Sequence, residues 1–151
     1  MPQSLSSLYA HSVFSVKNRN PFLKDAEIRR KTHAFPGGVA KKLECPPIIV
    51  GGTEDHVHLL CRSSRIISQA DYVKERKRVS TIWIKKREPA LVTFAWQRGY
   101  GAFSVSISNL DSVRKYIAEQ EEHHKKLSFQ DEYRALLRKH GIEWDERYVW
   151  E

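Results

Sequence analysis

The 151-residue sequence predicts a single α+β domain in which an antiparallel sheet packs against helices. Apolar residues make up 40% of the chain and charged residues 29%, which are proportions typical of a globular protein. Short apolar runs alternate with longer segments of helical periodicity, in the order β-α-β-β-α-β-β-α-α. Strands that follow each other directly pair as hairpins, which favours an antiparallel sheet. No internal repeat or linker divides the chain, so residues 1–151 are expected to form one domain.

The N-terminal segment is predicted to form a strand followed by an interrupted helix. Residues 7–16 are rich in aromatic and β-branched residues, which is typical of a strand. Residues 21–35 have a helical pattern with Pro21 near the start, where proline is tolerated. The Pro-Gly-Gly sequence at 36–38 should break this helix before residues 39–44 resume it.

The middle of the chain predicts a hairpin and a long basic helix. Residues 46–52 and 56–62 are short apolar runs separated by three residues, which indicates an antiparallel pair of strands. Ser68 and Asp71 form a capping box, and apolar residues recur after them at helical spacing. A long helix is therefore expected to begin at Ser68.

Residues 92–106 are expected to form two further strands that turn at residues 98–101, where two glycines flank Tyr100. A second capping box, formed by Ser108 and Asp111, predicts a helix over residues 108–126.

The C-terminal region is expected to form one more helix and a packed tail. Ser128 and Asp131 form a third capping box, and Gly141 is a good helix stop. The last ten residues are rich in aromatic side chains, which favours packing against the body over exposure to solvent.

The charge balance favours a polyanionic partner. The chain has 26 Lys and Arg against 18 Asp and Glu, which gives a formal charge of +8 and a pI near 9.6. Much of the positive charge falls in two clusters, at residues 74–78 and 85–87. This pattern is typical of nucleic-acid-binding proteins, although basic proteins without such partners are also common.

The sequence also indicates a cytoplasmic protein without a membrane partner. The first residues lack the basic start and apolar core of a signal peptide, and no apolar run approaches the roughly 20 residues of a membrane span. The two cysteines, Cys45 and Cys61, lie in apolar surroundings that suit reduced thiols.

His56 and His58 are the first candidates for chemistry. Successive side chains of a strand point to opposite faces, so the two histidines share one face while Val57 and Leu59 share the other. Two imidazoles on a rigid strand can bind a metal ion. They can equally be surface residues or hydrogen-bonded core residues, and no further Cys or His has the spacing of a zinc site.

Tyr116 and Gln120 are the second pair of candidates. In a helix over 108–126 they lie about 40° apart, beside the apolar stripe that contains Ile117. They are therefore expected at the edge of the core, where the helix meets the sheet. Simple packing of Tyr116 at this boundary, with Gln120 solvated, is the alternative interpretation.

Taken together, these motifs resemble the single-tyrosine transposases of the HUH class (His, hydrophobic residue, His), which occur with bacterial insertion sequences and include the REP-associated transposases. DHVHLLCR (55–62) matches the HUH motif, VRKYIAEQEEHH (113–124) matches the nucleophile helix, and WQRGYGAFSVS (96–106) matches the hairpin between them. The resemblance extends from about residue 8 to residue 150, with residues 127–151 as a C-terminal helix and aromatic tail. FPGG at 35–38 departs from the family pattern, because it interrupts the first helix.

The resemblance implies a DNA strand-transfer reaction with a covalent intermediate. Tyr116 would attack a phosphate in single-stranded DNA, which gives a 5′-phosphotyrosine and a free 3′-OH that can later rejoin the strands. His56, His58 and Gln120 would hold a metal ion next to Tyr116. Two imidazoles and an amide oxygen leave positions open for phosphate oxygens and water. The resemblance implies Mg²⁺, with Mn²⁺ able to substitute.

The resemblance also implies a ferredoxin-like sheet, a DNA substrate with hairpin ends and a homodimer in which two sheets join edge to edge. Five residues are candidates for DNA contact, although each is equally explained as part of a solvated basic face. They are Lys77, Arg78 and Ser80, with Arg98 and Tyr100 near the predicted turn.

Two other functions remain open at this point. A non-catalytic, ferredoxin-like module that binds single-stranded nucleic acid would explain the charge, but it leaves the histidine pair and the Tyr-x-x-x-Gln spacing as coincidence. A small metal-dependent hydrolase would use Tyr116 only to orient water. A covalent protein–DNA adduct separates the transposase from both.

Overall fold

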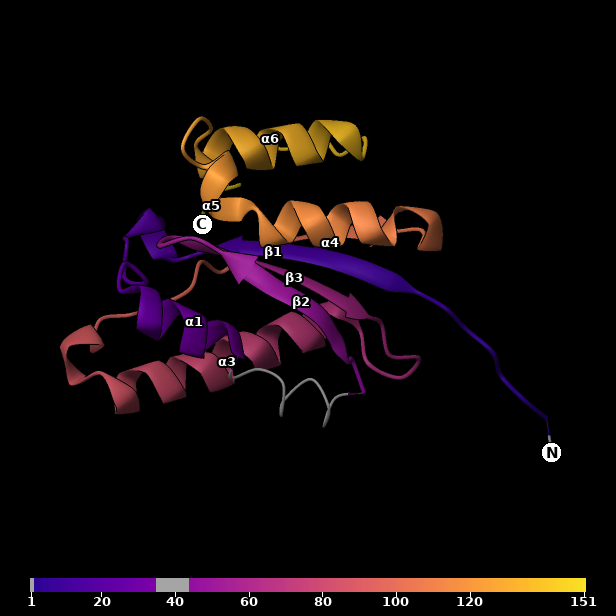
Figure 1. Cartoon of the computed structure of the whole chain (residues 1–151), viewed down its shortest axis with the longest axis horizontal. Coiled ribbons are helices and arrows are strands. Elements are labelled where there is room, and N and C mark those ends of the chain that lie inside the picture. The colour runs from indigo at the N-terminus through magenta and orange to yellow at the C-terminus, as the bar shows by residue number, and fades with distance from the viewer. Residues whose placement is uncertain (1, 35–43) are drawn as a thin grey trace.

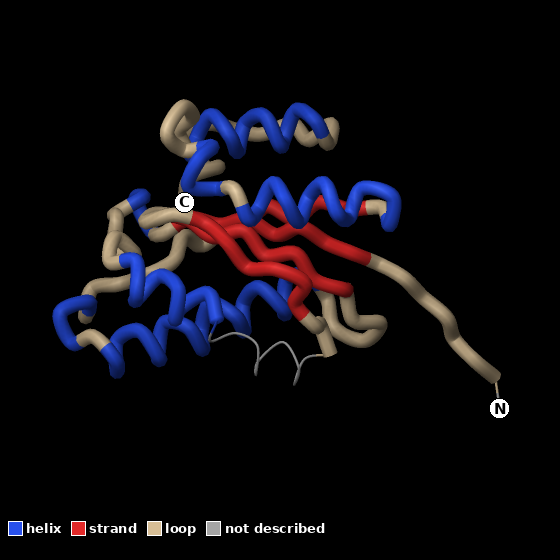
Figure 2. Tube along the Cα trace, in the orientation of Figure 1, coloured by secondary structure: helices blue, strands red, loops and turns tan. Residues whose placement is uncertain are grey.

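The computed structural model describes residues 2–34 and 44–151, and a four-stranded antiparallel sheet forms the centre of this part of the chain (Figures 1 and 2). The strands are β1 (Tyr9–Ser15), β2 (Pro47–Gly52), β3 (His56–Arg62) and β4 (Gly101–Val105). Their order across the sheet is β2-β3-β1-β4, and every neighbouring pair is antiparallel. The predicted α+β class is confirmed, and the order of strands is that of a ferredoxin-like sheet.

Helices cover both faces of the sheet (Figure 1). On one face lie α1 (Ala26–Ala34) and α3 (Gln69–Arg87). On the other lie α4 (Leu110–Ala118), α5 (Gln120–His123) and α6 (Phe129–Lys139). Single 3₁₀ turns at residues 17–19, 89–91 and 107–109 connect these elements. Within the described residues, no helix is both long enough and apolar enough to cross a membrane.

The alternation of side chains along the strands creates two separate cores. Phe14, Val57 and Leu59 point toward α1 and α3, where they pack in a cluster with Tyr72. The residues next to these in each strand point to the other face of the sheet. There Val13 joins a second cluster, which also contains Phe103 and three α6 residues, Phe129, Tyr133 and Leu137. His56 and His58 share this second face, because they alternate with Val57 and Leu59.

Three of the predicted helix signals are confirmed. The side chains of Ser68 and Ser128 accept hydrogen bonds from the backbone N–H groups of Asp71 and Asp131, so both capping boxes begin a helix as expected. Gly141 follows α6 with a φ of 67°, a left-handed conformation that suits glycine at a helix end.

The predicted helix over residues 108–126 is wrong in two respects. The helix starts later than predicted, because Ser108 lies in a 3₁₀ turn and its hydroxyl bonds to Ser106 instead of capping the helix. Helix α4 therefore begins at Leu110. The helix is also interrupted at Glu119, whose φ and ψ of −99° and 21° are not helical. The short helix α5 then turns away from α4 toward α6 (Figure 1).

The two strands predicted over residues 92–106 are reduced to β4 alone. Trp96 makes only an isolated bridge to Val16, and the carbonyl groups of residues 97–99 do not enter a strand ladder. Instead, the Lys77 ammonium binds all three carbonyl oxygens, at 2.8, 3.2 and 2.7 Å in chain order. A side chain from α3 therefore satisfies the groups that a strand partner would have satisfied.

The first helix begins at Ala26, five residues after Pro21, because the intervening residues form a turn that buries Leu23. The carboxylate of Asp25 accepts the N–H groups of Glu27 and Ile28 and so caps α1. The predicted break at 36–38 lies outside the described residues, as does almost all of the helix expected over 39–44, apart from Glu44, which lies in a turn.

The C-terminal tail packs on the body, as its aromatic residues predicted. Trp144, Val149 and Trp150 contact the second core. The Trp150 ring lies 5.0 Å from the Arg134 guanidinium, and the backbone carbonyl of Glu151 accepts a hydrogen bond of 2.9 Å from Gly99 N–H. The tail thereby ties α6 to the segment that precedes β4.

Gly51 is predicted to be essential for the close approach of α4 to the sheet. A Cβ atom at this position would lie 2.6 Å from the Ile117 carbonyl oxygen, which is closer than any real contact. Gly51→Ala should therefore lower the free energy of unfolding by about 1–3 kcal/mol, because α4 must shift. Gly51→Val should cost more. Urea unfolding of both variants measures this, and unchanged stability in both would contradict the packing argument.

Candidate active site

The floor of the site is formed by the histidine pair on β3. His56 and His58 are both fully buried, and their ring centroids lie 5.1 Å apart on the face covered by α4, α5 and α6. The interpretation as exposed surface residues is therefore wrong. Because the strand is held between β2 and β1, the two rings project from a rigid base.

The structure brings Gln120 and Tyr116 to this pair, although α4 ends between them. Gln120 is the first residue of α5, is 1% exposed, and places its side-chain oxygen 2.9 Å from His56 Nε2. The solvated position that was the alternative for Gln120 is excluded. Tyr116 lies on α4, is half-buried, and has its ring centroid 5.9 Å from that of His58. Tyr116 and Gln120 thus lie where the helix contacts the sheet, as predicted, but on either side of the break between α4 and α5.

Glu132 on α6 lies at the centre of the site, and sequence reasoning did not identify it. One carboxylate oxygen lies 3.0 Å from His58 Nε2 and 3.0 Å from His124 Nε2. The other accepts hydrogen bonds from the Tyr116 hydroxyl and, at 2.9 Å, from the Gln120 amide. Glu132 is only 1% exposed. The available signal was an acidic residue on the apolar stripe of an amphipathic helix, between Phe129 and Tyr133.

Three outer contacts orient the histidine rings. Asp55 Oδ1 lies 2.7 Å from His56 Nδ1, with Thr53 Oγ1 at 3.0 Å from the same nitrogen. His11, from β1, places its Nε2 2.7 Å from His58 Nδ1. Each ring therefore has its Nδ1 side occupied and directs Nε2 toward Gln120 and Glu132. Hydrogen bonds of this kind fix ring orientation around metal sites.

The charges in the site depend on Glu132. Burial disfavours its ionised form, but hydrogen bonds from His124, His58 and Tyr116 outweigh this and hold the pKa of Glu132 well below its ordinary range. Burial also lowers the pKa of His58 to about 4, so this imidazole is neutral at pH 7. Burial and the neighbouring carboxylate raise the pKa of Tyr116 above its ordinary value, so its phenol is protonated and donates to Glu132.

This arrangement has the chemistry of a divalent-cation site. His56 Nε2, His58 Nε2 and Glu132 supply a group of ligand atoms within 4.8 Å of one another, and the Gln120 oxygen contacts the same His56 nitrogen. Imidazole nitrogens bind transition-metal ions and carboxylate or amide oxygens bind Mg²⁺ or Mn²⁺, so the mixed set can hold a divalent cation, and the buried carboxylate provides negative charge for it. The donor set therefore fits such an ion, with Glu132 added to the three residues that the sequence suggested.

The five candidate DNA-contact residues lie elsewhere, around α3 on the opposite face of the sheet. Arg98 and Arg78 are exposed, although Arg78 forms an ion pair with Glu75. Lys77 binds backbone carbonyls, and burial lowers its pKa to about 8. Ser80 is 5% exposed and accepts the Trp96 indole N–H at 2.9 Å, and Tyr100 is half-buried. A groove of about 650 Å³ passes along Arg78, Arg98 and Tyr100.

Comparison with known proteins agrees with this fold. Residues 4–120 match the family described as IS200-like transposases, and since this is most of the chain, the protein belongs to that family. The fold is similar to the crystal structure of a candidate transposase from Deinococcus radiodurans R1, with a TM-score of 0.65 and 22% identity over 80% of this chain and 95% of that one.

A second structure of similar fold is that of a REP-associated tyrosine transposase bound to a REP hairpin. Its TM-score is 0.58, with 12% identity over 84% of this chain and 74% of that one. A search among curated proteins finds no match.

Glu132 is predicted to be the most costly residue of the site to remove. Glu132→Ala leaves donors on His58, Tyr116 and Gln120 without a partner in a buried space, so the free energy of unfolding should fall by roughly 3 kcal/mol. Urea unfolding in EDTA measures the loss. The exposed acidic residue Glu143 provides the control, since Glu143→Ala should change stability by less than about 0.5 kcal/mol. Equal effects of the two substitutions would contradict this assignment.

Proposed function

We propose that this IS200-like transposase cuts and rejoins single-stranded DNA through a 5′-phosphotyrosine on Tyr116, with a divalent cation held by the histidine pair. The observation that carries the proposal is the convergence of Tyr116 with His56, His58 and Gln120 in one buried site. The DNA-strand transfer expected of the family needs a nucleophile beside a group that stabilises charge on the phosphate. Tyr116 is the candidate nucleophile, and a cation at the histidine pair would stabilise that charge.

Tyr116 is the proposed nucleophile. Its oxygen forms a bond to phosphorus while the P–O3′ bond breaks, so one strand end carries a 3′-OH and the other is joined to the tyrosine through its 5′-phosphate. The phenol is protonated at neutral pH and donates to Glu132, whose lowered pKa makes this carboxylate a poor base. The phenol proton therefore passes to solvent as the bond to phosphorus forms. The leaving O3′ takes up a proton from solvent.

The proposed ligands of the cation are His56, His58 and Gln120, together with Glu132. A bound Mg²⁺ or Mn²⁺ would supply positive charge to phosphate oxygens and offset the Glu132 charge that now raises the pKa of Tyr116. Asp55 and His11 would keep the two imidazole rings oriented. The identity of the ion, Mg²⁺ with Mn²⁺ as a substitute, stays a prediction.

The proposed substrate is single-stranded DNA with hairpin ends. The groove beside α3 carries Arg78, Arg98 and Tyr100, which combine positive charge with an aromatic ring. These groups suit phosphate and base contacts. Lys77 and Ser80 would stabilise the wall of this groove through their hydrogen bonds to Gln97 and Trp96. The structural relative that is bound to a REP hairpin supports a hairpin as the kind of DNA involved.

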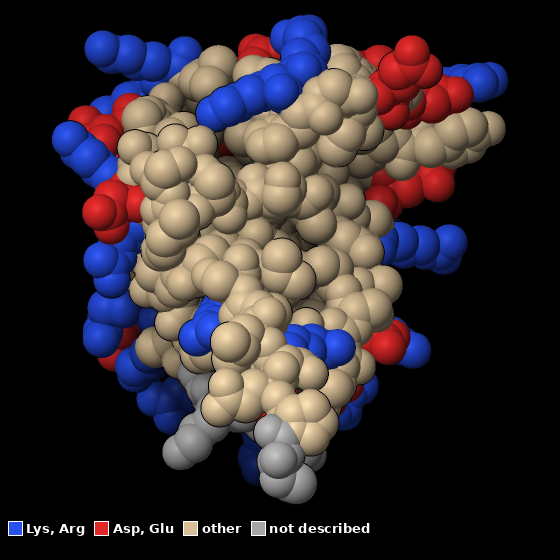
Figure 3. Space-filling model, turned by 90° about the vertical axis from the view of Figure 1, so that its right-hand side faces the viewer, with Lys and Arg blue, Asp and Glu red and all other residues tan. Residues whose placement is uncertain are grey.

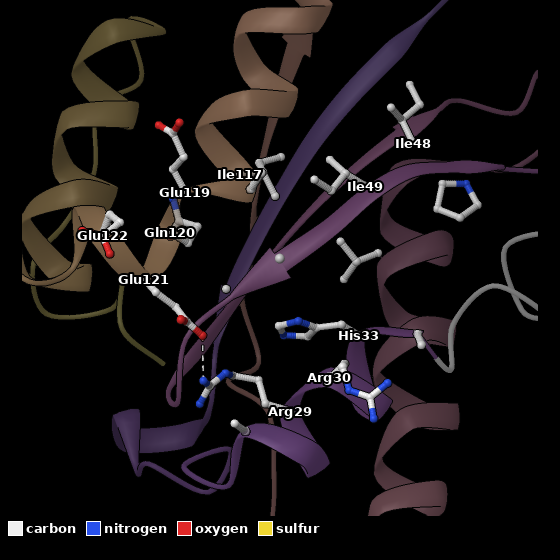
Figure 4. Close-up of a pocket in the computed structure, with 17 residues that line it drawn as sticks. Arg29, Arg30, His33, Ile48, Ile49, Ile117, Glu119, Gln120, Glu121 and Glu122 are labelled. Carbon is white, nitrogen blue, oxygen red and sulfur yellow. Dashed lines mark hydrogen bonds and ion pairs between the residues drawn. The ribbon is translucent and has the colours of Figure 1, made fainter.

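A homodimer is also part of the proposal. β2 is an edge strand, and a groove runs along it between α1 and the end of α4 (Figure 4). Arg30 and His33 line one side of this groove, and Glu119 and Glu122 line the other, while Arg29 and Glu121 form an ion pair of 2.7 Å across the end of the strand. Within the described residues no strand pairs with the outer edge of β2, and such an edge can pair with a second copy. The dimer itself stays a prediction.

Tyr116→Phe is predicted to abolish the covalent adduct while leaving the fold and cation binding intact. The substitution removes one oxygen and keeps the ring. Wild type and variant are incubated with a labelled pool of random 40-nucleotide single strands and Mg²⁺ or Mn²⁺, then separated on a denaturing gel. Tyr148→Phe, in the exposed part of the tail, is the matched control and should still form the adduct. An adduct on the Tyr116→Phe protein, or none on wild type, would overturn the proposed function.

Cation binding is predicted to depend on the four proposed ligands and not on Tyr116. His58→Ala and Glu132→Gln should each weaken Mn²⁺ binding at least about tenfold, because each removes a donor atom. Titration of free Mn²⁺ by electron paramagnetic resonance measures this without any DNA. Tyr116→Phe and Glu143→Gln should bind as wild type does. Unchanged Mn²⁺ affinity in His58→Ala would remove the metal from the mechanism.

A further inference from the structure

A cleft of about 560 Å³ opens beside Tyr116. It lies between α4 and α6 above β4, and both Tyr116 and Glu132 line it. Its volume is within the roughly 300–1,000 Å³ range of small-ligand sites. A phosphate that reaches Tyr116 through this cleft brings its own sugar and base with it. The chemistry of the residues that line the cleft therefore decides which part of a nucleotide it can bind.

The walls of the cleft suit the flat face of a base. Val113 and Leu136 contribute apolar surface from the two helices, and Leu127, which is 40% exposed, adds a further aliphatic group. The ring of His140 stacks on Phe103, with centroids 4.5 Å apart and an angle of 26° between the planes. His140 is exposed at the rim, so a base can stack on its free face.

The rim of the cleft suits the polar parts of a nucleotide. Lys139 is exposed at the end of α6 and, within the described residues, forms no ion pair, so its ammonium group can meet a phosphate. Asn109 and Ser112 are exposed at the start of α4 and offer an amide and a hydroxyl to a base edge. Figure 3 views the molecule from the end where α4 begins and α6 finishes, and shows both basic and acidic side chains around a largely uncharged centre.

We infer that the α4–α6 cleft binds the unpaired nucleotide next to the scissile phosphate, with its base between the apolar wall and His140 and its neighbouring phosphate on Lys139. The inference rests on the proposed function, because it takes the DNA phosphate to Tyr116. It assigns base contact to a place far from the α3 groove, on the other face of the sheet. The nucleotide next to the cut is thereby separated from the surface proposed for the hairpin.

The test compares two fluorescein-labelled probes by anisotropy, a 12-nucleotide oligothymidylate and an abasic strand of the same length. Wild type should bind oligothymidylate about tenfold more tightly, as expected for stacking of a base on a side chain. Ala135→Trp fills the cleft from an exposed position of α6 and should remove this preference. Ala90→Trp, at an exposed position beyond α3, is the control and should keep it.

Two further variants separate base contact from phosphate contact. His140→Ala should weaken binding of oligothymidylate alone, whereas Lys139→Gln should weaken both probes by the same factor. Thermal unfolding shows whether Ala135→Trp folds. If it does not, His140→Ala alone tests the inference. A base preference that survives both Ala135→Trp and His140→Ala would overturn the inference, as would equal binding of the two probes by wild type.

The outcomes also distinguish this inference from the proposed function. If wild type forms the Tyr116 adduct but Ala135→Trp and His140→Ala both keep the base preference, the cleft does not hold a base and the inference is wrong, while the transposase chemistry stands. If the base preference is lost in Ala135→Trp but wild type forms no adduct, the cleft binds a nucleotide and the proposed reaction is wrong. A cleft occupied by a second copy would show as a change of sedimentation in Ala135→Trp without any change in base preference, which also overturns the inference.

Discussion

The buried carboxylate of Glu132 is the contact on which the arrangement of three helices over β3 depends. Its oxygens bind groups from β3, α4 and α5, and also His124, while Glu132 itself belongs to α6. A buried carboxylate without hydrogen bonds costs several kcal/mol, so these elements are stable over the sheet only when donors and acceptor meet. The break at Glu119 follows from this requirement, because it turns α5 so that Gln120 faces the carboxylate.

The alternation of side chains along β3 gives the two faces of the sheet different chemistry. Val57 and Leu59 enter the apolar core beneath α3, while His56 and His58 form a polar site beneath α4 and α5. The proposed DNA-contact groove and the proposed site of strand cleavage therefore lie on opposite faces of one thin sheet. A protein built in this way can hold a folded stem on one face while a single strand reaches the other. The sheet would then fix the distance between the proposed DNA-contact groove and the proposed cleavage site.

Glu132 also changes the electrostatics expected for the proposed metal site. Two imidazoles and an amide are neutral ligands, whereas the carboxylate adds a full negative charge close to the Nε2 atoms of the histidine pair. This charge favours a bound cation, yet it also raises the pKa of Tyr116 and so opposes formation of the phenolate. In the proposed mechanism a cation would have the opposite effect on the tyrosine, so the reactivity of the phenol would depend on both groups.

The fold class, the shared face of His56 and His58, and the helix starts at Ser68 and Ser128 could be predicted from the residues alone, because each follows from contacts or periodicity within a few residues. The family could also be predicted from three motifs in order. The break after α4, the single strand β4 and the place of Glu132 could not be predicted. Glu132 contacts His58 across 74 residues of sequence, and no local pattern encodes a contact that forms only when separate elements fold against each other.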